Sequence, residues 1–338
     1  MDETAPAREA TGCRNAVSAG AGGSNVAEAP YRSAVPTALL IAAASAYGAN
    51  IPFARLASFA GVSGADLVAL RVALLLIVLA AAAVLSQTSV RVPRGERSTL
   101  FGLGLTTALV GLAYVSSVSF IPVGIAVLVF YTYPLLILLA SPFVDGGGLT
   151  LNRLIAFALA FAGIALAIGP SFQALDWRGI ALAAAASIAA ATQFFFASRA
   201  PGGGGIVTVF WVHVVILPVA LLASLVSGGP ASASTFIGAF WPVAIMSTLY
   251  FGGFVAQLRG MRQTSAAAAG LIFCLEPIVA TIAAALMLGE RLSLTQYGGG
   301  ALVLAGIVTS LASRPVRRIR EPTPVLMDAV CVERRPLS

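Results

Sequence analysis

The sequence predicts an all-α transmembrane protein, a ten-helix bundle of two inverted five-helix repeats with the N- and C-termini in the cytoplasm. Three observations lead to this prediction. The 338 residues are 59% hydrophobic and only 10% charged, with a mean hydropathy of +0.94, whereas soluble proteins carry about 25% charged residues. Apolar runs long enough to cross a bilayer follow one another along the chain. A segment of the first half recurs in the second half.

Each apolar run is about 20 residues long, the length of helix that crosses about 30 Å of hydrocarbon at about 1.5 Å per residue. Short separators such as Ile121–Pro122 and Gly146–Gly148 predict tight turns between consecutive spans. The predicted spans cover residues 36–54, 66–86, 98–118, 123–143, 152–170, 179–198, 206–227, 236–256, 266–288 and 295–313.

The positions of the arginines predict which way these spans run. All 20 basic residues are arginine. Sixteen of them fall in the two tails and the even-numbered loops, three fall in the odd-numbered loops (Arg55, Arg178 and Arg291), and Arg71 lies inside a span. Cytoplasmic loops are enriched in basic residues, so this distribution places both tails in the cytoplasm.

The two tails differ from the rest of the chain in composition. Residues 1–32 are rich in Ala, Gly and Ser, lack an apolar core and a signal-peptide pattern, and are predicted to be disordered. Residues 314–338 form a basic cytoplasmic tail with several prolines. Between the tails, residues 33–172 and 173–313 are predicted to form the two repeats.

The repeat is visible as an alignment without gaps at an offset of 143 residues. Residues 122–164 match residues 265–307 at 13 of 43 positions, and the matches include the pairs Pro134/Pro277 and Gly163/Gly306. Five helices separate the copies, so the second copy must enter the membrane from the opposite side. Inverted repeats of this kind are typical of secondary transporters, in which two similar halves exchange conformations.

The repeats resemble the EamA-type units of the drug/metabolite transporter superfamily over nearly the whole of residues 36–313. The residues that carry this resemblance are Leu275–Glu276–Pro277, Leu288–Gly289–Glu290–Arg291–Leu292–Ser293 and Gly299–Gly300–Ala301 through Ala305–Gly306 in the second copy, and Tyr47–Gly48–Ala49–Asn50, Leu70–Arg71 and Tyr133–Pro134 in the first. The two copies differ at two of these positions. In the first copy Gly147 occupies the position equivalent to Glu290, and Tyr133 occupies the position equivalent to Glu276.

The resemblance implies a multi-pass protein of the plasma membrane, the bacterial inner membrane, that exports or imports small metabolites or drugs. Export of an amino acid or a derivative is one such activity. The expected partners are a small-molecule substrate and the lipid bilayer. A homodimer is compatible with the sequence, which does not fix the number of subunits.

Three ionisable residues within the predicted spans are candidates for coupling transport to protons. Glu276 is the one carboxylate well inside a span, and such acids are functional hypotheses by default, although a structural hydrogen bond next to Pro277 is the alternative. Arg71 either lines the pathway or extends to the headgroup region. His213, the one histidine, serves either as a proton relay or as an interhelical hydrogen-bonding group.

Uncharged polar residues on apolar helices turn inward, where they line a cavity or hydrogen-bond neighbouring helices. The resembled fold places those of its first, fourth and sixth helices toward the cavity, which are Asn50, Tyr131 and Gln193. The candidates for the substrate cavity are Asn50, Tyr114, Tyr131, Gln193, Tyr250 and Glu276.

Other classes of function leave no corresponding pattern in the sequence. Phosphate-loop, HExxH and GxSxG motifs are absent, so neither a cofactor, a metal nor an enzymatic activity is predicted. The arginines occur singly between apolar runs, which argues against nucleic-acid binding. A membrane-embedded enzyme, or a receptor or scaffold that does not transport, is the alternative function.

Overall fold

The computed structural model describes residues 34–146, 149–169, 175–203, 205–288 and 291–312. Within these ranges the chain is helical and contains no β-strand. Ten helical segments are long and apolar enough to cross a membrane, as predicted. The elements are α1 (Val35–Phe59), α2 (Gly64–Leu85), η1 (Arg94–Glu96), α3 (Arg97–Ser117), α4 (Val123–Phe130), α5 (Tyr133–Val144), α6 (Leu151–Ile168), α7 (Trp177–Ser198), η2 (Pro201–Gly203), α8 (Ile206–Val226), α9 (Ala233–Gly238), α10 (Phe240–Met261), α11 (Ala266–Phe273), α12 (Glu276–Leu288) and α13 (Leu294–Ala312).

Several helix ends differ from those predicted by hydropathy. The predicted span 236–256 begins later, because Ser232 caps the short helix α9 and the spanning helix α10 begins only at Phe240. That helix also continues to Met261 and includes Arg259 in its last turn, where a cation interacts favourably with the helix dipole. The predictions for residues 1–32, Gly147, Glu290 and 314–338 lie outside the described residues.

Two of the ten spans are not continuous helices. The fourth span is divided into α4 and α5, and the ninth into α11 and α12. Each second segment has a proline at its second position, Pro134 or Pro277. Because proline has no N–H, it cannot donate to the carbonyl four residues earlier, and the helix breaks there. The sequence analysis predicted both spans, and the structure adds the break within each.

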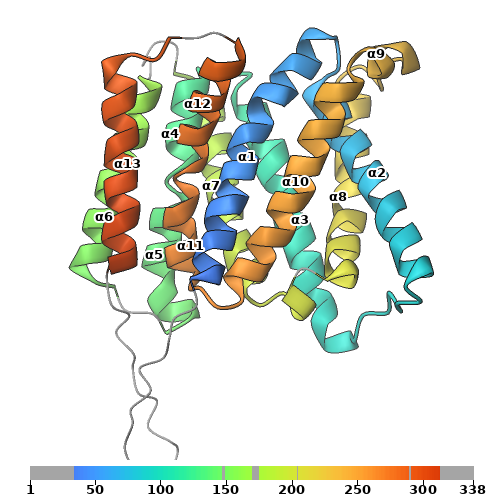
Figure 1. The fold of residues 1–338 in the computed structure, drawn as a ribbon, viewed down its shortest axis with the longest axis horizontal. Coiled ribbons are helices and arrows are strands. Elements are labelled where there is room, and N and C mark those ends of the chain that lie inside the picture. The colour runs from blue at the N-terminus through green and yellow to red at the C-terminus, as the bar shows by residue number, and fades with distance from the viewer. Residues whose placement is uncertain (1–33, 147–148, 170–174, 204, 289–290, 313–338) are drawn as a thin grey trace, which may run out of the picture. The chain divides into compact units, whose positions relative to one another are not determined.

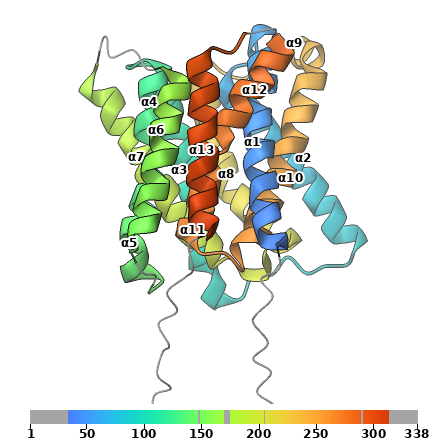
Figure 2. The ribbon, with the colours of Figure 1, turned by 60° about the vertical axis from the view of Figure 1, so that its left-hand side comes forward.

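The helices pair as two copies of one unit related by inversion. Figures 1 and 2 show α6 beside α13, and these two helices pack along much of their length. Helix α1 packs against α10 in the same way as α7, its counterpart, packs against α3. Helix α2 packs against its own counterpart α8. Helix α1 begins and α13 ends at the same end of the bundle, which we call the terminal end (Figure 1).

Glycines in α6 and α13 give a direct measure of this symmetry. A Cβ atom added to Gly163 would lie 2.5 Å from the carbonyl oxygen of Gly299, and one added to Gly306 would lie 2.6 Å from that of Ala156. Both residues of the second contact are offset by 143 positions from their counterparts in the first. The two backbones therefore touch twice in the same way, and glycine is required for this close approach.

Neighbouring glycines of α13 provide a stability test. In G299A the new methyl group would meet the Gly163 carbonyl oxygen at 2.5 Å, so α6 and α13 must separate. We expect a loss of about 1–3 kcal/mol of stability, measured as a lower midpoint of thermal unfolding in detergent. G298A is the matched control, since a Cβ at Gly298 meets nothing within 4 Å. Equal midpoints for the two variants would contradict the observed packing.

Candidate functional site

The two halves enclose a central cavity of about 810 Å³. Among the described residues, its lining comes from α1, α2, α3, α4, α5, α7, α8, α10, α11 and α12, whereas α6 and α13 take no part. From the middle of the bundle the cavity extends to the end where α2 begins and α8 ends. There its lining includes Gly64 and Val226, which are exposed to the surroundings. We call this the open end.

Close contacts join two pairs of cavity-lining helices toward the terminal end. A Cβ on Gly260 of α10 would lie 2.8 Å from Leu40 Cγ and 2.9 Å from the Pro36 carbonyl oxygen of α1. A Cβ on Gly104 of α3 would lie 2.6 Å from Val215 Cβ of α8. Contacts this short leave no passage between the two helices of each pair. A second cavity of about 550 Å³, with Leu39 and Arg259 in its lining, lies nearer the terminal end.

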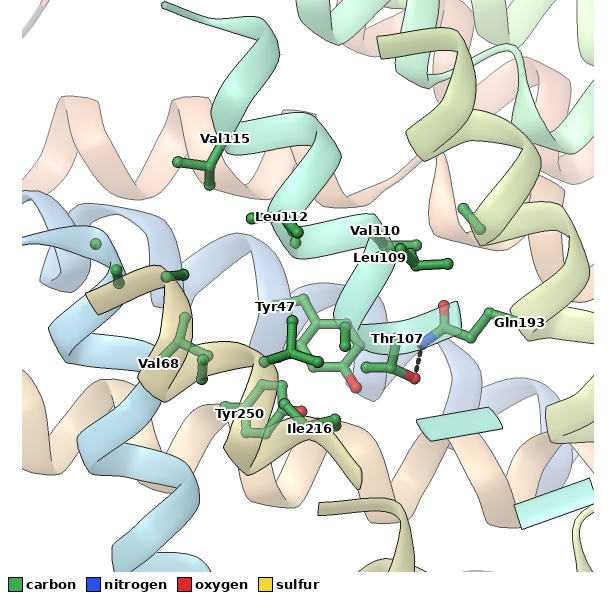
Figure 3. Close-up of a pocket in the computed structure, with 18 of the residues that line it drawn as sticks. Tyr47, Val68, Thr107, Leu109, Val110, Leu112, Val115, Gln193, Ile216 and Tyr250 are labelled. Carbon is green, nitrogen blue, oxygen red and sulfur yellow. Dashed lines mark hydrogen bonds between the residues drawn. The ribbon is translucent and has the colours of Figure 1, made fainter. Parts of the chain in front are cut away.

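The deep part of the cavity has an aromatic wall. The Tyr47 ring lies 6.0 Å from Tyr250 and 5.9 Å from Phe273, measured between ring centroids. Phe273 in turn meets Phe194 edge-on at 5.2 Å. Figure 3 shows Tyr47 and Tyr250 side by side, with Gln193 and Thr107 across the cavity. An aromatic wall of this kind suits the apolar body of an organic molecule.

Arg71 and Glu276 are the basic and the acidic residue among the described residues that line the cavity. Arg71 lies in the second turn of α2, and its guanidinium carbon is 3.9 Å from the centre of the Tyr250 ring. Glu276 begins α12 at the break of the ninth span, where the helix N-terminus favours negative charge. The Tyr131 side chain forms a hydrogen bond to its carboxyl group. Both charged residues line the cavity and are partly exposed to it.

Two of the predicted amide residues also line the cavity, and each is held by a hydrogen bond. The Asn50 amide donates to the Met246 carbonyl oxygen at 2.7 Å and thereby joins α1 to α10. The Gln193 amide donates to Thr107 Oγ1 at 2.8 Å and joins α7 to α3, as the dashed line in Figure 3 marks. These are the two symmetry-related helix pairs, so the two amides have corresponding positions in the two halves.

His213 lies behind the cavity wall and is fully buried. Its Nδ1 is 2.7 Å from the Val209 carbonyl oxygen, which can only accept. In the neutral ring Nδ1 is therefore the donor, and Nε2 accepts from the Tyr250 hydroxyl at 3.1 Å. His213 therefore positions Tyr250, whose ring lies next to Arg71. His213 does not itself line the cavity, whereas Tyr250 does.

Two of the predicted tyrosines do not line the cavity. Tyr131 is buried and turned toward Glu276, so it contacts a cavity residue from behind. Tyr114 packs against Phe130, with ring centroids 5.2 Å apart, in a separate apolar cluster of α3, α4 and α7. The structure thus brings Asn50, Arg71, Gln193, Tyr250 and Glu276 together around one space, and places Tyr114, Tyr131 and His213 outside it.

The structure adds residues that the sequence analysis did not single out as site candidates. Tyr47 stands in the wall and donates a hydrogen bond to Gln257 at 3.0 Å. Asp66 is a buried carboxylate near the open end, where it accepts a hydrogen bond from Ser224 and one from the backbone N–H of Ala231 at 3.3 Å. In the sequence, an acidic residue in the first turn of a predicted span is the signal that could have identified Asp66 as a site candidate. Asp66 ties α2 to the end of α8.

Ten apolar spans in two inverted repeats, around a central cavity accessible from the open end, define the class of protein: a polytopic membrane transporter. A family comparison agrees. The model of the EamA-like transporter family matches residues 36–169 and 177–312, and the chain belongs to this family.

Two further comparisons place the chain among known proteins. A solved crystal structure has the same fold, with a TM-score of 0.64 and 21% sequence identity over 81% of this chain and 99% of the matched chain. No curated protein gives a significant match.

The hydrogen bond between His213 and Tyr250 can be tested by a double-mutant cycle. H213L leaves the buried Tyr250 hydroxyl without its partner and should lower the free energy of unfolding by about 1–3 kcal/mol. Y250F in the H213L background should recover about 1 kcal/mol of that loss. Detergent-induced unfolding of the four proteins measures these values, with L221A on the lipid-exposed side of α8 as a control. Strictly additive effects would exclude the interaction.

Proposed function

We propose that the protein is a secondary transporter that exports a small organic metabolite or drug-like compound, such as an amino acid or a derivative, by alternating access. The observation that carries this proposal is the central cavity, which is accessible from the open end, while close contacts join α1 to α10 and α3 to α8 toward the terminal end. Its volume of about 810 Å³ suits a small organic molecule. Exchange of conformations between the two inverted halves would close the open end and open the other.

The direct test is uptake into proteoliposomes. Comparison of the medium from cells that overexpress or lack the protein would first identify metabolites whose release depends on it. The purified full-length chain should then exchange those labelled metabolites with saturable kinetics. Absence of saturable exchange by a folded protein, across all metabolites whose release changed, would contradict the proposal.

The proposed orientation of the protein follows from its arginines. Arginines concentrate on the side of the tails, so the terminal end is proposed to face the cytoplasm of a bacterial cell and the cavity to face outward. In this orientation the structure corresponds to the state that releases an exported solute. Binding from the cytoplasm would take place in the alternate state.

Native cysteines allow this orientation to be tested. Cys13 and Cys331 belong to the two tails, whereas Cys274 is buried. A membrane-impermeant maleimide should therefore leave the native protein unlabelled in intact cells and label it in inverted membrane vesicles. S234C, an exposed position in α9 at the open end, should be labelled in intact cells. Labelling of the native tails from outside would reverse the proposed orientation.

Glu276 is the proposed proton-coupling group. It lines the cavity at the break between α11 and α12, where a carboxyl group can meet both the solute and water that enters from the open end. The first half has Tyr133 at this place, so coupling would reside in the second half. A buried acid that alternates between two sides of a membrane can carry one proton in each cycle.

E276Q tests the coupling. Glutamine keeps the size of the side chain and an oxygen that can accept from Tyr131, but it cannot take up or release a proton. We expect E276Q to keep solute exchange in proteoliposomes while losing accumulation driven by a pH gradient. Y131F is the matched control, because it removes the hydrogen bond and keeps the carboxyl group, and it should retain pH-driven accumulation. Unchanged pH-driven accumulation by E276Q would remove the coupling role.

A further inference from the structure

The guanidinium group of Arg71 has unused hydrogen-bonding capacity inside the cavity. Its Nε atom is buried and has no hydrogen-bond partner among the described residues. The ion pairs recorded for those residues, Arg178–Asp176 and Arg199–Asp145, lie at helix ends and do not involve it. Arg71 is also the one basic residue among those that line the cavity.

Tyr250 holds this guanidinium in a defined orientation. The guanidinium carbon lies 3.9 Å from the ring centre, and the tyrosine hydroxyl is fixed from behind by His213. Stacking on an aromatic face occupies the flat side of a guanidinium and uses none of its N–H groups. The N–H donors of Arg71 therefore remain available for an acceptor in the plane of the group.

Glu276 does not serve as that acceptor. No ion pair joins Arg71 to Glu276 among the described residues, and Tyr47 interacts electrostatically with both of them. Tyr47 also packs against Phe273 and against Tyr250, the ring that Arg71 covers. The cation is therefore held by an aromatic ring and is not paired with the acid.

A buried guanidinium N–H without an acceptor costs free energy, as at the Nε atom of Arg71. We propose that Arg71 is the anion-binding group of the cavity and binds a carboxylate of the transported solute through two parallel N–H···O hydrogen bonds. The apolar or aromatic body of the solute would lie against Tyr47, Phe194 and Phe273. A carboxylate fits better than a phosphate dianion, because one arginine supplies a single positive charge and the rest of the wall is largely apolar.

This inference rests on the proposed transport function and adds the class of substrate, an organic carboxylate. The probes are phenylacetate, phenylacetamide and benzylamine, which share an aromatic ring and carry a negative, a neutral or a positive group. Calorimetry with the purified full-length chain in detergent measures their binding. We expect phenylacetate to bind about tenfold more tightly than phenylacetamide, the difference that one charge-assisted pair provides.

Two variants assign the preference to Arg71. R71Q should bind phenylacetate and phenylacetamide equally, and R71K, which keeps the charge without the planar fork, should retain part of the preference. A measurement on the native chain covers the case in which R71Q does not fold. Phenylglyoxal should modify Arg71, as read by peptide mass spectrometry, and phenylacetate should protect this residue better than phenylacetamide does.

The outcomes separate this inference from the transport proposal. Equal binding of all three probes, binding of none, or an undiminished carboxylate preference in R71Q would overturn the role of Arg71. A native protein that exchanges only neutral or cationic solutes in proteoliposomes would overturn it while leaving transport intact. Carboxylate-selective binding that depends on Arg71, without exchange of any solute, would support the binding site and contradict transport.

Discussion

A helix that breaks inside a bilayer leaves backbone groups that lipid cannot satisfy, and such breaks are tolerated only where protein or a water-accessible cavity surrounds them. Pro134 and Pro277 impose a break of this kind in each half. Both breaks adjoin the central cavity, which is lined by Tyr133 from one half and Glu276 from the other. The two breaks thus bring one aromatic and one acidic side chain to the cavity from equivalent positions of the two halves.

Helix contacts in the bundle are of two kinds. Helices α6 and α13 meet backbone to backbone through glycine and contribute nothing to the cavity. The helices that line the cavity meet both through glycine, as at Gly104 and Gly260, and through amide hydrogen bonds, as Asn50 and Gln193 show. Glycine contacts fix the distance between two helices closely, whereas single side-chain hydrogen bonds can be exchanged for others when helices move. The hydrogen bonds that can be exchanged in this way therefore lie among the helices around the cavity.

The ten spans, their pairing as two inverted repeats and the position of Glu276 in the cavity region could be predicted from the sequence, whereas for Arg71 the pathway and the headgroup region remained alternatives. Bilayer thickness fixes the length of a span, and the shared spacing of Pro134/Pro277 and Gly163/Gly306 records the duplication. Which side chains face the cavity was harder to predict. These helices are apolar on all sides, so hydropathy does not show how each is rotated about its axis. For this reason Tyr131 was predicted to line the cavity, although it is buried beside Glu276. Tyr47, which does line the cavity, was not selected.

The difference between Tyr133 and Glu276 at equivalent positions has an energetic consequence. A transporter with a single coupling acid moves one proton in each turnover, and each unit of pH difference is worth about 1.4 kcal/mol per proton. If Glu276 is that acid, the pH gradient alone can sustain at most about a tenfold solute ratio for each unit of pH difference. A second acid in place of Tyr133 would allow two protons to move with each solute molecule. The maximum solute ratio would then rise to about a hundredfold for each unit of pH difference. With Tyr133 in the first half and Glu276 in the second, the proposed coupling would use one proton for each solute molecule and would accept the lower limit on the solute ratio.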